Sequence, residues 1–239
     1  YISASTTVLL NRVESSKHTG AGAFIDAYGT VTVTGSPIIP AAFNNNEGYF
    51  SAGVYGGYAG LHINHANGLV KLTNIQANSN LGAGMLIDAN GPVSLLGVLN
   101  EFNLNSEDGI FYDPYQSYGI KIARAVGNVT LTNFQLSANH GGGIYISNSE
   151  AGNVSLNSTI SGFISSITNG MGDAASVYGL RIITNGSVVI NKVDISKNSD
   201  PGVFIENQNG LISKPVNISY SNITENTGGD GLVVYSAGQ

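Results

Sequence analysis

Apolar and polar residues alternate along this chain in short segments that recur with one pattern. Each copy is a glycine followed by an apolar residue, a variable residue and a second apolar residue. The eight copies are residues 22–25, 60–63, 84–87, 119–122, 143–146, 179–182, 202–205 and 231–234. Alternation with a period of two predicts a strand with one buried face. A strand repeated this often predicts a solenoid.

Two further strands follow most of the glycine segments. The second strand alternates Val, Leu or Ile with Thr, Ser or Lys, at residues 30–33, 69–72, 92–95, 128–131, 153–156, 187–190 and 215–218. The third is an apolar residue with asparagine three positions later, at residues 43–46, 75–78, 102–105, 136–139, 195–198 and 223–226. The sequence therefore predicts an all-β, single-stranded parallel β-helix (solenoid) of about eight three-strand coils, which we take to be right-handed by precedent.

Stacking of these coils explains why the same residue types recur. Neighbouring strands lie about 4.8 Å apart, so every backbone N–H and C=O can pair with the coil above or below. Val, Leu and Ile then form columns inside the helix. The repeated asparagines are expected to stack at the turns and to satisfy backbone groups there. We expect the glycine of each segment to supply a backbone conformation that a Cβ atom would forbid.

A longer period is superimposed on the single coil. Val70, Val129 and Val188 are 59 residues apart, since 129 − 70 = 188 − 129 = 59. Short and long coils therefore alternate, and the true repeat is a pair of coils. The additional residues precede the glycine strand and predict three long loops, at residues 47–59, 106–118 and 165–178.

Two of these loops are rich in aromatic residues. The candidate ligand-binding residues are Tyr49, Phe50 and Tyr55 in the first loop, Phe111, Tyr112 and Tyr115 in the second, and Tyr145 on a glycine strand. The middle residue of each glycine strand should point outward, which defines an outward column of Phe24, His62, Leu86, Lys121, Tyr145, Arg181, Phe204 and Val233. Cation–π contacts are expected where Tyr145 lies between Lys121 and Arg181. Either the loops fold over this column and bury it, or the aromatic residues form a platform on which sugar rings stack.

Composition narrows the function classes. Charged residues are only 10% of the 239 residues and the net charge is −6, so nucleic acid is not an expected partner. The chain has no cysteine, which leaves neither disulfides nor thiolate metal sites. No apolar run is long enough for a membrane span, and no signal peptide is visible before Tyr1. We expect one β-helix domain over residues 1–239, cut from a longer chain.

Three motifs that could mark functional sites have simpler explanations in the repeat pattern. Six N-glycosylation sequons begin at Asn128, Asn153, Asn157, Asn185, Asn217 and Asn222, but the turn-plus-strand pattern would produce most of them anyway. His62 and His65 are three residues apart and are expected on opposite faces of a strand, so no metal site is predicted. The acids Glu107, Asp108 and Asp113 lack the regular spacing of calcium-binding repeats.

An enzyme of the pectin-lyase-like fold is an alternative, because many parallel β-helices cleave polysaccharides. A hydrolase needs two carboxylates across the glycosidic bond. The glycine strands carry three acids, Asp26, Asp88 and Glu206. No two of them are expected close enough together to act on the same glycosidic bond. Catalysis is therefore not the expected function, and no cofactor is predicted.

The repeats resemble those of the parallel β-helix proteins of microbial cell surfaces, many of which are segments of adhesin-like secreted chains. A weaker similarity is to polymorphic outer-membrane autotransporters, which combine Phe-x-x-Asn with Gly-Gly-Ala-Ile. Residues 43–46 and 102–105 match the first motif, whereas residues 141–144 carry Gly143 in place of the alanine. The resemblance implies a non-enzymatic structural or adhesive rod at the cell surface or outside the cell. Its expected partners are other copies or neighbouring repeats, end to end, and surface glycans.

Overall fold

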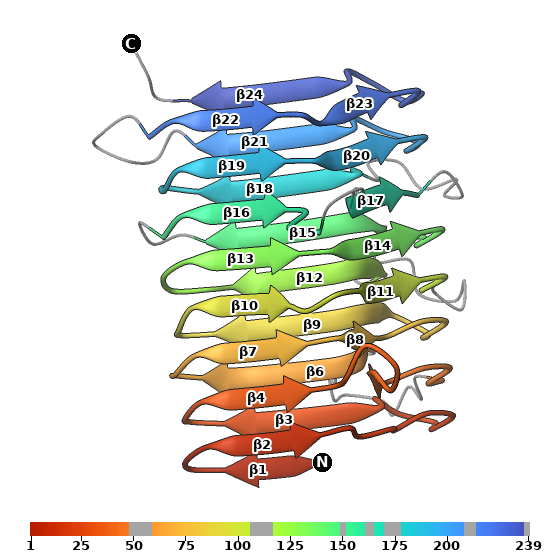
Figure 1. Ribbon diagram of the computed structural model, residues 1–239, viewed down its shortest axis with the longest axis vertical. Helices are drawn as coiled ribbons and strands as arrows, with labels where there is room; N and C mark the ends of the chain where they lie inside the picture. Colours follow the sequence, from red (N-terminus) through yellow and green to blue (C-terminus); the bar gives the residue numbers. More distant parts are fainter. Residues whose placement is uncertain are drawn as a thin grey trace, which may run out of the picture.

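The computed structural model describes residues 1–47, 59–105, 117–148, 152–160, 165–169, 178–207 and 214–236. Every regular element in this part of the chain is a strand, and the strands form three parallel sheets (Figure 1). Successive strands along the chain belong to different sheets, and each sheet joins strands from successive coils. The chain is therefore a parallel β-helix, as the sequence predicts. The first strand, β1 (Ile2–Ala4), and the last, β24 (Leu232–Ser236), lie at opposite ends of the rod (Figure 1).

The glycine segments form sheet A, which has nine described strands. In stacking order they are β1 (Ile2–Ala4), β3 (Ala23–Ala27), β6 (Ala59–Ala66), β9 (Ala83–Ala89), β12 (Tyr118–Arg124), β15 (Gly142–Asn148), β18 (Leu180–Thr184), β21 (Val203–Asn207) and β24 (Leu232–Ser236). The first strand was not predicted, because no glycine segment marks it.

The second and third strands of each coil form sheets B and C. Sheet B contains β2 (Val8–Asn11), β4 (Val31–Thr34), β7 (Val70–Thr73), β10 (Val93–Leu96), β13 (Val129–Thr132), β16 (Val154–Asn157), β19 (Val188–Asn191) and β22 (Val216–Ser219). Sheet C contains β5 (Ala41–Ala42), β8 (Ile75–Gln76), β11 (Asn100–Asn103), β14 (Phe134–Ser137), β17 (Ser165–Thr168), β20 (Val193–Ser196) and β23 (Asn222–Thr224). The strands of sheet B begin one residue later than predicted, because the residue before each valine belongs to the turn.

The register keeps like residues in line and builds the core. In sheet B, Val70 pairs with Val93 and Val93 with Val129, while Leu72 pairs with Leu95. These side chains are fully buried. Each such burial stabilises the fold by about 1.5–3 kcal/mol, so most of the stability comes from contacts between coils.

The predicted asparagine stack is present and follows the strands of sheet C. Its seven members, which we call the asparagine ladder, are Asn46, Asn80, Asn105, Asn139, Asn169, Asn198 and Asn226. The backbone N–H of each donates to the side-chain Oδ1 of the next over 2.9–3.1 Å. The side-chain Nδ2 donates to the same oxygen. The ladder thus satisfies the polar groups of a buried corner.

Two positions of this ladder differ from the prediction. The segment 75–78 contributes no ladder residue, because Ala77 and Asn80 take the apolar and asparagine positions. The loop predicted at 165–178 begins too early, since β17 occupies Ser165–Thr168 and Asn169 joins the ladder.

The spacing explains why Asn169 was missed. In most coils the residue before the ladder asparagine is left-handed, for example Ala138 with φ 52° and Leu104 with φ 56°. Ile167 is only two residues before Asn169, so this coil has one corner residue fewer, and Thr168 continues the strand.

The glycine segments need glycine for a reason other than the one predicted. Gly84 and Gly179 do not have positive φ. A Cβ atom on Gly179 would instead lie 2.6 Å from Asn198 Nδ2 and 2.7 Å from the Gly202 carbonyl oxygen. Glycine is therefore required because the ladder and the next coil approach its Cα closely.

The alternation of short and long coils is confirmed by the register of sheet A. Ile63 pairs with Ile87, 24 residues later (87 − 63), and Ile87 pairs with Ile122, 35 residues later (122 − 87). In the chain, the extra residues of the long coils come after a strand of sheet C and before the next strand of sheet A.

Candidate functional site

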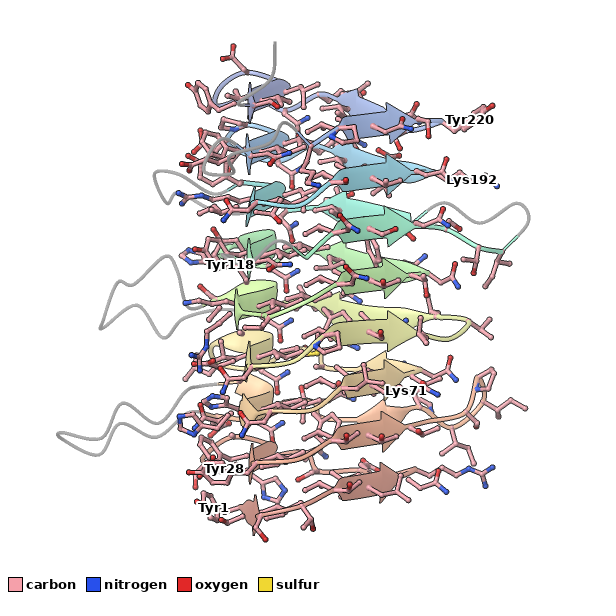
Figure 2. The ribbon with its side chains drawn as sticks, turned by 90° about the vertical axis from the view of Figure 1, so that its left-hand side faces the viewer. Tyr1, Tyr28, Lys71, Tyr118, Lys192 and Tyr220 are labelled. Atoms are coloured by element: carbon pink, nitrogen blue, oxygen red, sulfur yellow. The ribbon has the colours of Figure 1, made fainter. Side chains whose placement is uncertain are left out.

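The outward column exists as predicted on sheet A. The register aligns Lys121 with Tyr145, Tyr145 with Arg181, and Arg181 with Phe204. Inward residues alternate with them and are fully buried, as Ile144 and Ile146 are around Tyr145. Figure 2 shows Tyr1, Tyr28 and Tyr118 on one side of the rod, with Lys71 and Lys192 toward the other.

Arg181 is the centre of an aromatic cluster in this column. Its guanidinium carbon lies 5.3 Å from the ring centre of Tyr178, 5.5 Å from that of Phe204 and 5.7 Å from that of Tyr145. These distances are those of cation–π contacts. The predicted contact of Tyr145 with Arg181 is confirmed.

Further rings extend the cluster along the rod. Tyr118 lies 5.7 Å from Tyr145 and Tyr235 lies 5.6 Å from Phe204, between ring centres. Tyr178 also contacts Phe204 at 5.3 Å. We call Tyr118, Tyr145, Tyr178, Arg181, Phe204 and Tyr235 the aromatic–arginine cluster. It spans strands β12 to β24, and Tyr145, Arg181 and Phe204 are half-buried.

The sequence prediction included Tyr145 but not the other ring partners of Arg181 as site residues. Tyr178 ends the loop that precedes β18, and Tyr235 lies two positions after Val233, in the neighbouring outward column. The period-two alternation of β24 would have identified Tyr235 as outward-facing. No local pattern indicates that Tyr178 turns back onto Phe204.

A second group of aromatic residues lies at the other end of sheet A. Tyr1 stacks on Phe24 at 5.3 Å, and the Phe24 ring meets the imidazole of His62 edge-on at 4.5 Å. His62 is 8% exposed, and its Nδ1 atom has no hydrogen-bond partner in the described structure. Burial lowers the pKa of His62 to about 4, although Asp88 and Asp26 raise it in part.

This pKa predicts a loss of stability in acid. The ordinary value is 6.5, so between pH 6.5 and pH 4 the unfolded chain binds a proton that the folded chain does not. Stability from neutral His62 is complete above pH 6.5 and is lost as the pH falls toward 4, by about 3 kcal/mol. Urea unfolding of wild type and His62→Phe across this range measures the effect. The difference between the two should change with pH, and parallel profiles would contradict the prediction.

Two of the acids on the glycine strands contact basic side chains. Asp26 Oδ1 lies 3.0 Å from His65 Nδ1, and Asp88 Oδ1 accepts a 2.7 Å hydrogen bond from Arg124 Nε. His65 also stacks on Tyr28. Each of these two carboxylates is therefore bound by a basic residue of a neighbouring coil.

His65 does not lie on the face expected for it. The strand alternation predicts that it points opposite to His62, but His65 is exposed and contacts the outward Asp26. The cause is a register shift between Ile63 and Ala66, together with a φ of 57° at His65. A bulge of this kind redirects a side chain.

The remaining predicted site residues lie outside the described residues. They are Tyr49, Phe50, Tyr55, Phe111, Tyr112 and Tyr115, and the acids Glu107, Asp108 and Asp113 do so as well. Among the residues that the structure describes, no three His, Asp or Glu side chains gather into a group that could hold a metal ion. The same residues contain no helix that is long and apolar enough to cross a membrane.

In the contacts between described residues, three of the six sequon asparagines accept a hydrogen bond from the next coil, and Asn157 does so from Asn191 Nδ2 at 2.7 Å. Asn128 and Asn153 each accept a hydrogen bond from a backbone N–H of the next coil, at 2.9 and 3.0 Å. They therefore have a structural role in the stack. Asn217 and Asn222 are exposed on the last full coil.

Comparison with known proteins leaves the site to be interpreted from its own geometry. No protein-family model matches the chain, and neither does any curated protein or solved structure.

Proposed function

We propose that this chain is a non-enzymatic β-helical rod with a structural or adhesive role at the cell surface or outside the cell. The observation that supports it best is the continuity of the stack. Three sheets pass from coil to coil without interruption, and the asparagine ladder joins seven coils. Such quasi-one-dimensional packing suits a stiff spacer or filament. The resemblance of the repeats to those of surface β-helices supports the location.

The ends of the described rod support end-to-end contact. On β24, Leu232 is 45% exposed and Val234 is 38% exposed, whereas their register partners Val203 and Ile205 are fully buried. At the other end Ile2 is half-buried, although its partner Ile25 is fully buried. Apolar residues beside an unpaired strand edge favour the addition of another strand. The proposed partners are therefore other copies or neighbouring repeats, with β1 of one adding to β24 of another.

This proposal predicts self-association that depends on protein concentration. Val234→Lys should weaken the association roughly tenfold or more, because it places a charge in the contact. The matched control is Val189→Lys, since Val189 is also 38% exposed but lies on β19 of sheet B, where β22 is paired beyond it and the strand edge is not open. Sedimentation velocity over a range of concentrations measures both variants. A wild-type chain that stays monomeric at every concentration would overturn the end-to-end contact.

A second candidate function is carbohydrate binding on sheet A. The aromatic–arginine cluster favours it, because the partly exposed rings of Tyr145, Tyr178, Phe204 and Tyr235 lie along the rod, whereas Tyr118 is buried beside them. Tyrosine and phenylalanine rings provide large apolar faces and tyrosine adds a hydroxyl group, which is the combination that sugar rings require. Surface glycans are the proposed ligands.

A further inference from the structure

The positive charges of the outward column alternate with aromatic rings. Lys121 on β12 and Arg181 on β18 are separated by Tyr145 on β15, and Phe204 follows on β21. Because neighbouring strands are about 4.8 Å apart, the two cations are two strands, or about 10 Å, apart along the rod. The column therefore presents cation, ring, cation and ring at regular intervals.

Arg181 is a cation without an anionic partner in the described structure. None of the ion pairs found among the described residues includes it. Three aromatic rings surround its guanidinium group, and its Nε atom is buried without a hydrogen bond. Rings on its faces exclude water, and a poorly solvated charge interacts more strongly with an opposite charge than one in bulk water does.

Other charges near the column are already engaged. Asp88 is bound to Arg124, and Glu206, in the neighbouring column on β21, has a partner of its own. A ligand on the aromatic–arginine cluster would therefore meet Arg181 as a cation that is in no ion pair of the described residues. A neutral ligand lying on the cluster would leave this guanidinium group unpaired, which disfavours it.

We propose that the aromatic–arginine cluster binds an acidic polysaccharide that runs parallel to the rod axis. One sugar ring stacks on Tyr145 and another on Phe204, while the carboxylate of the sugar between them accepts hydrogen bonds from the Arg181 guanidinium. A sugar unit of an extended chain is about as long as one coil is high. A chain in which charged and uncharged sugars alternate therefore matches the alternation of cations and rings. The inference rests on the carbohydrate-binding candidate above and names its ligand class.

Nucleic acid fits the same surface poorly. The chain has a net charge of −6, and this part of the outward column contains two cations, Lys121 and Arg181, rather than a basic patch. Binding to a phosphate backbone draws on many such contacts. An acidic polysaccharide with one charge for every second sugar needs only a few contacts with cations.

Affinity electrophoresis in gels that contain hyaluronan or dextran tests the proposal. Hyaluronan alternates a carboxylated sugar with an uncharged one, and dextran is neutral. We expect hyaluronan to retard the wild-type chain, dextran to leave its mobility unchanged, and added salt to reduce the retardation. Arg181→Gln should bind hyaluronan roughly tenfold more weakly. Arg181→Lys should bind with intermediate strength, since it keeps the charge but loses the planar stack.

Lys71→Gln is the matched control, because Lys71 is an exposed cation on β7 of sheet B (Figure 2). It should bind like wild type. Circular dichroism and urea midpoints check that each variant is folded. If Arg181→Gln does not fold, the comparison of Arg181→Lys with wild type tests the proposal. Unchanged retardation of folded Arg181 variants would overturn the proposal. Equal retardation by both polymers would overturn the acidic ligand class. Retardation by neither would remove the carbohydrate candidate while leaving the rod, which sedimentation tests separately.

Discussion

Replacing Asn139 with alanine is expected to lower the free energy of unfolding by about 4 kcal/mol, because it opens the asparagine ladder in its middle. Asn139 is fully buried. Its Oδ1 accepts hydrogen bonds from both the backbone N–H and the Nδ2 of Asn105, at 3.1 and 2.8 Å. Its own Nδ2 donates to the Phe102 carbonyl and to Asn169 Oδ1. Alanine leaves several of these buried groups without partners, at about 1–3 kcal/mol for each unsatisfied group.

Asn217→Ala is the matched control for this prediction. Asn217 is exposed on the outer face of β22 and its side chain makes no hydrogen bond in the described structure, so the same substitution there should change stability by less than about 0.5 kcal/mol. Urea unfolding followed by circular dichroism measures both variants. Similar midpoints for the two would mean that the ladder does not stabilise the stack.

Gly179→Ala is expected to have the second largest effect, a loss of about 3 kcal/mol. The added Cβ would meet Asn198 Nδ2 at 2.6 Å and the Gly202 carbonyl oxygen at 2.7 Å. Neither group can move freely, since Asn198 is a ladder residue and Gly202 belongs to the next coil. Overpacking of this kind typically costs about 1–3 kcal/mol, and damage to the ladder adds to it.

The last coil provides a control for the glycine at the same position of the repeat. A Cβ on Gly231 would have Ile223 Cγ2 as its nearest neighbour, at 3.7 Å, which is ordinary van der Waals contact. Gly231→Ala should therefore leave stability unchanged or raise it by up to about 1 kcal/mol, because alanine restricts the unfolded chain. Thermal unfolding compares the pair. An equal loss in both variants would show that local backbone preference, and not the next coil, selects glycine.

These two residues also show how far sequence reasoning reaches. The recurrence of asparagine at residues 105, 139 and 198 is sufficient to predict a ladder. The recurrence of glycine correctly predicts that a side chain is not tolerated at this position. The expected reason was a special φ, whereas the structure shows that the next coil approaches the glycine closely. Repetition reveals that a position is constrained and does not reveal by what.

The errors occur where one coil departs from the repeat. Asn169 was missed because its corner is one residue shorter, and the ladder position of Asn80 was assigned to Asn78. His65 was placed on the wrong face because a bulge interrupts β6. Insertions and bulges shift the alternation of inward and outward residues. After such a shift, only the register with the next coil shows which face a residue lies on.

By itself the sequence determined the parallel β-helix, the inward and outward residues of the glycine segments, and the alternation of coil lengths. The reason is that identical coils bury identical positions, so the fold is written as a period that can be counted. The tertiary structure alone decided that further rings join Tyr145 around Arg181. Tyr178 and Phe204 pack there as well, because three strands and a loop end converge at this point. The contact of Tyr178 with Phe204, 26 positions later (204 − 178 = 26), depends on where the end of a loop meets the next coil and leaves no local pattern in the chain.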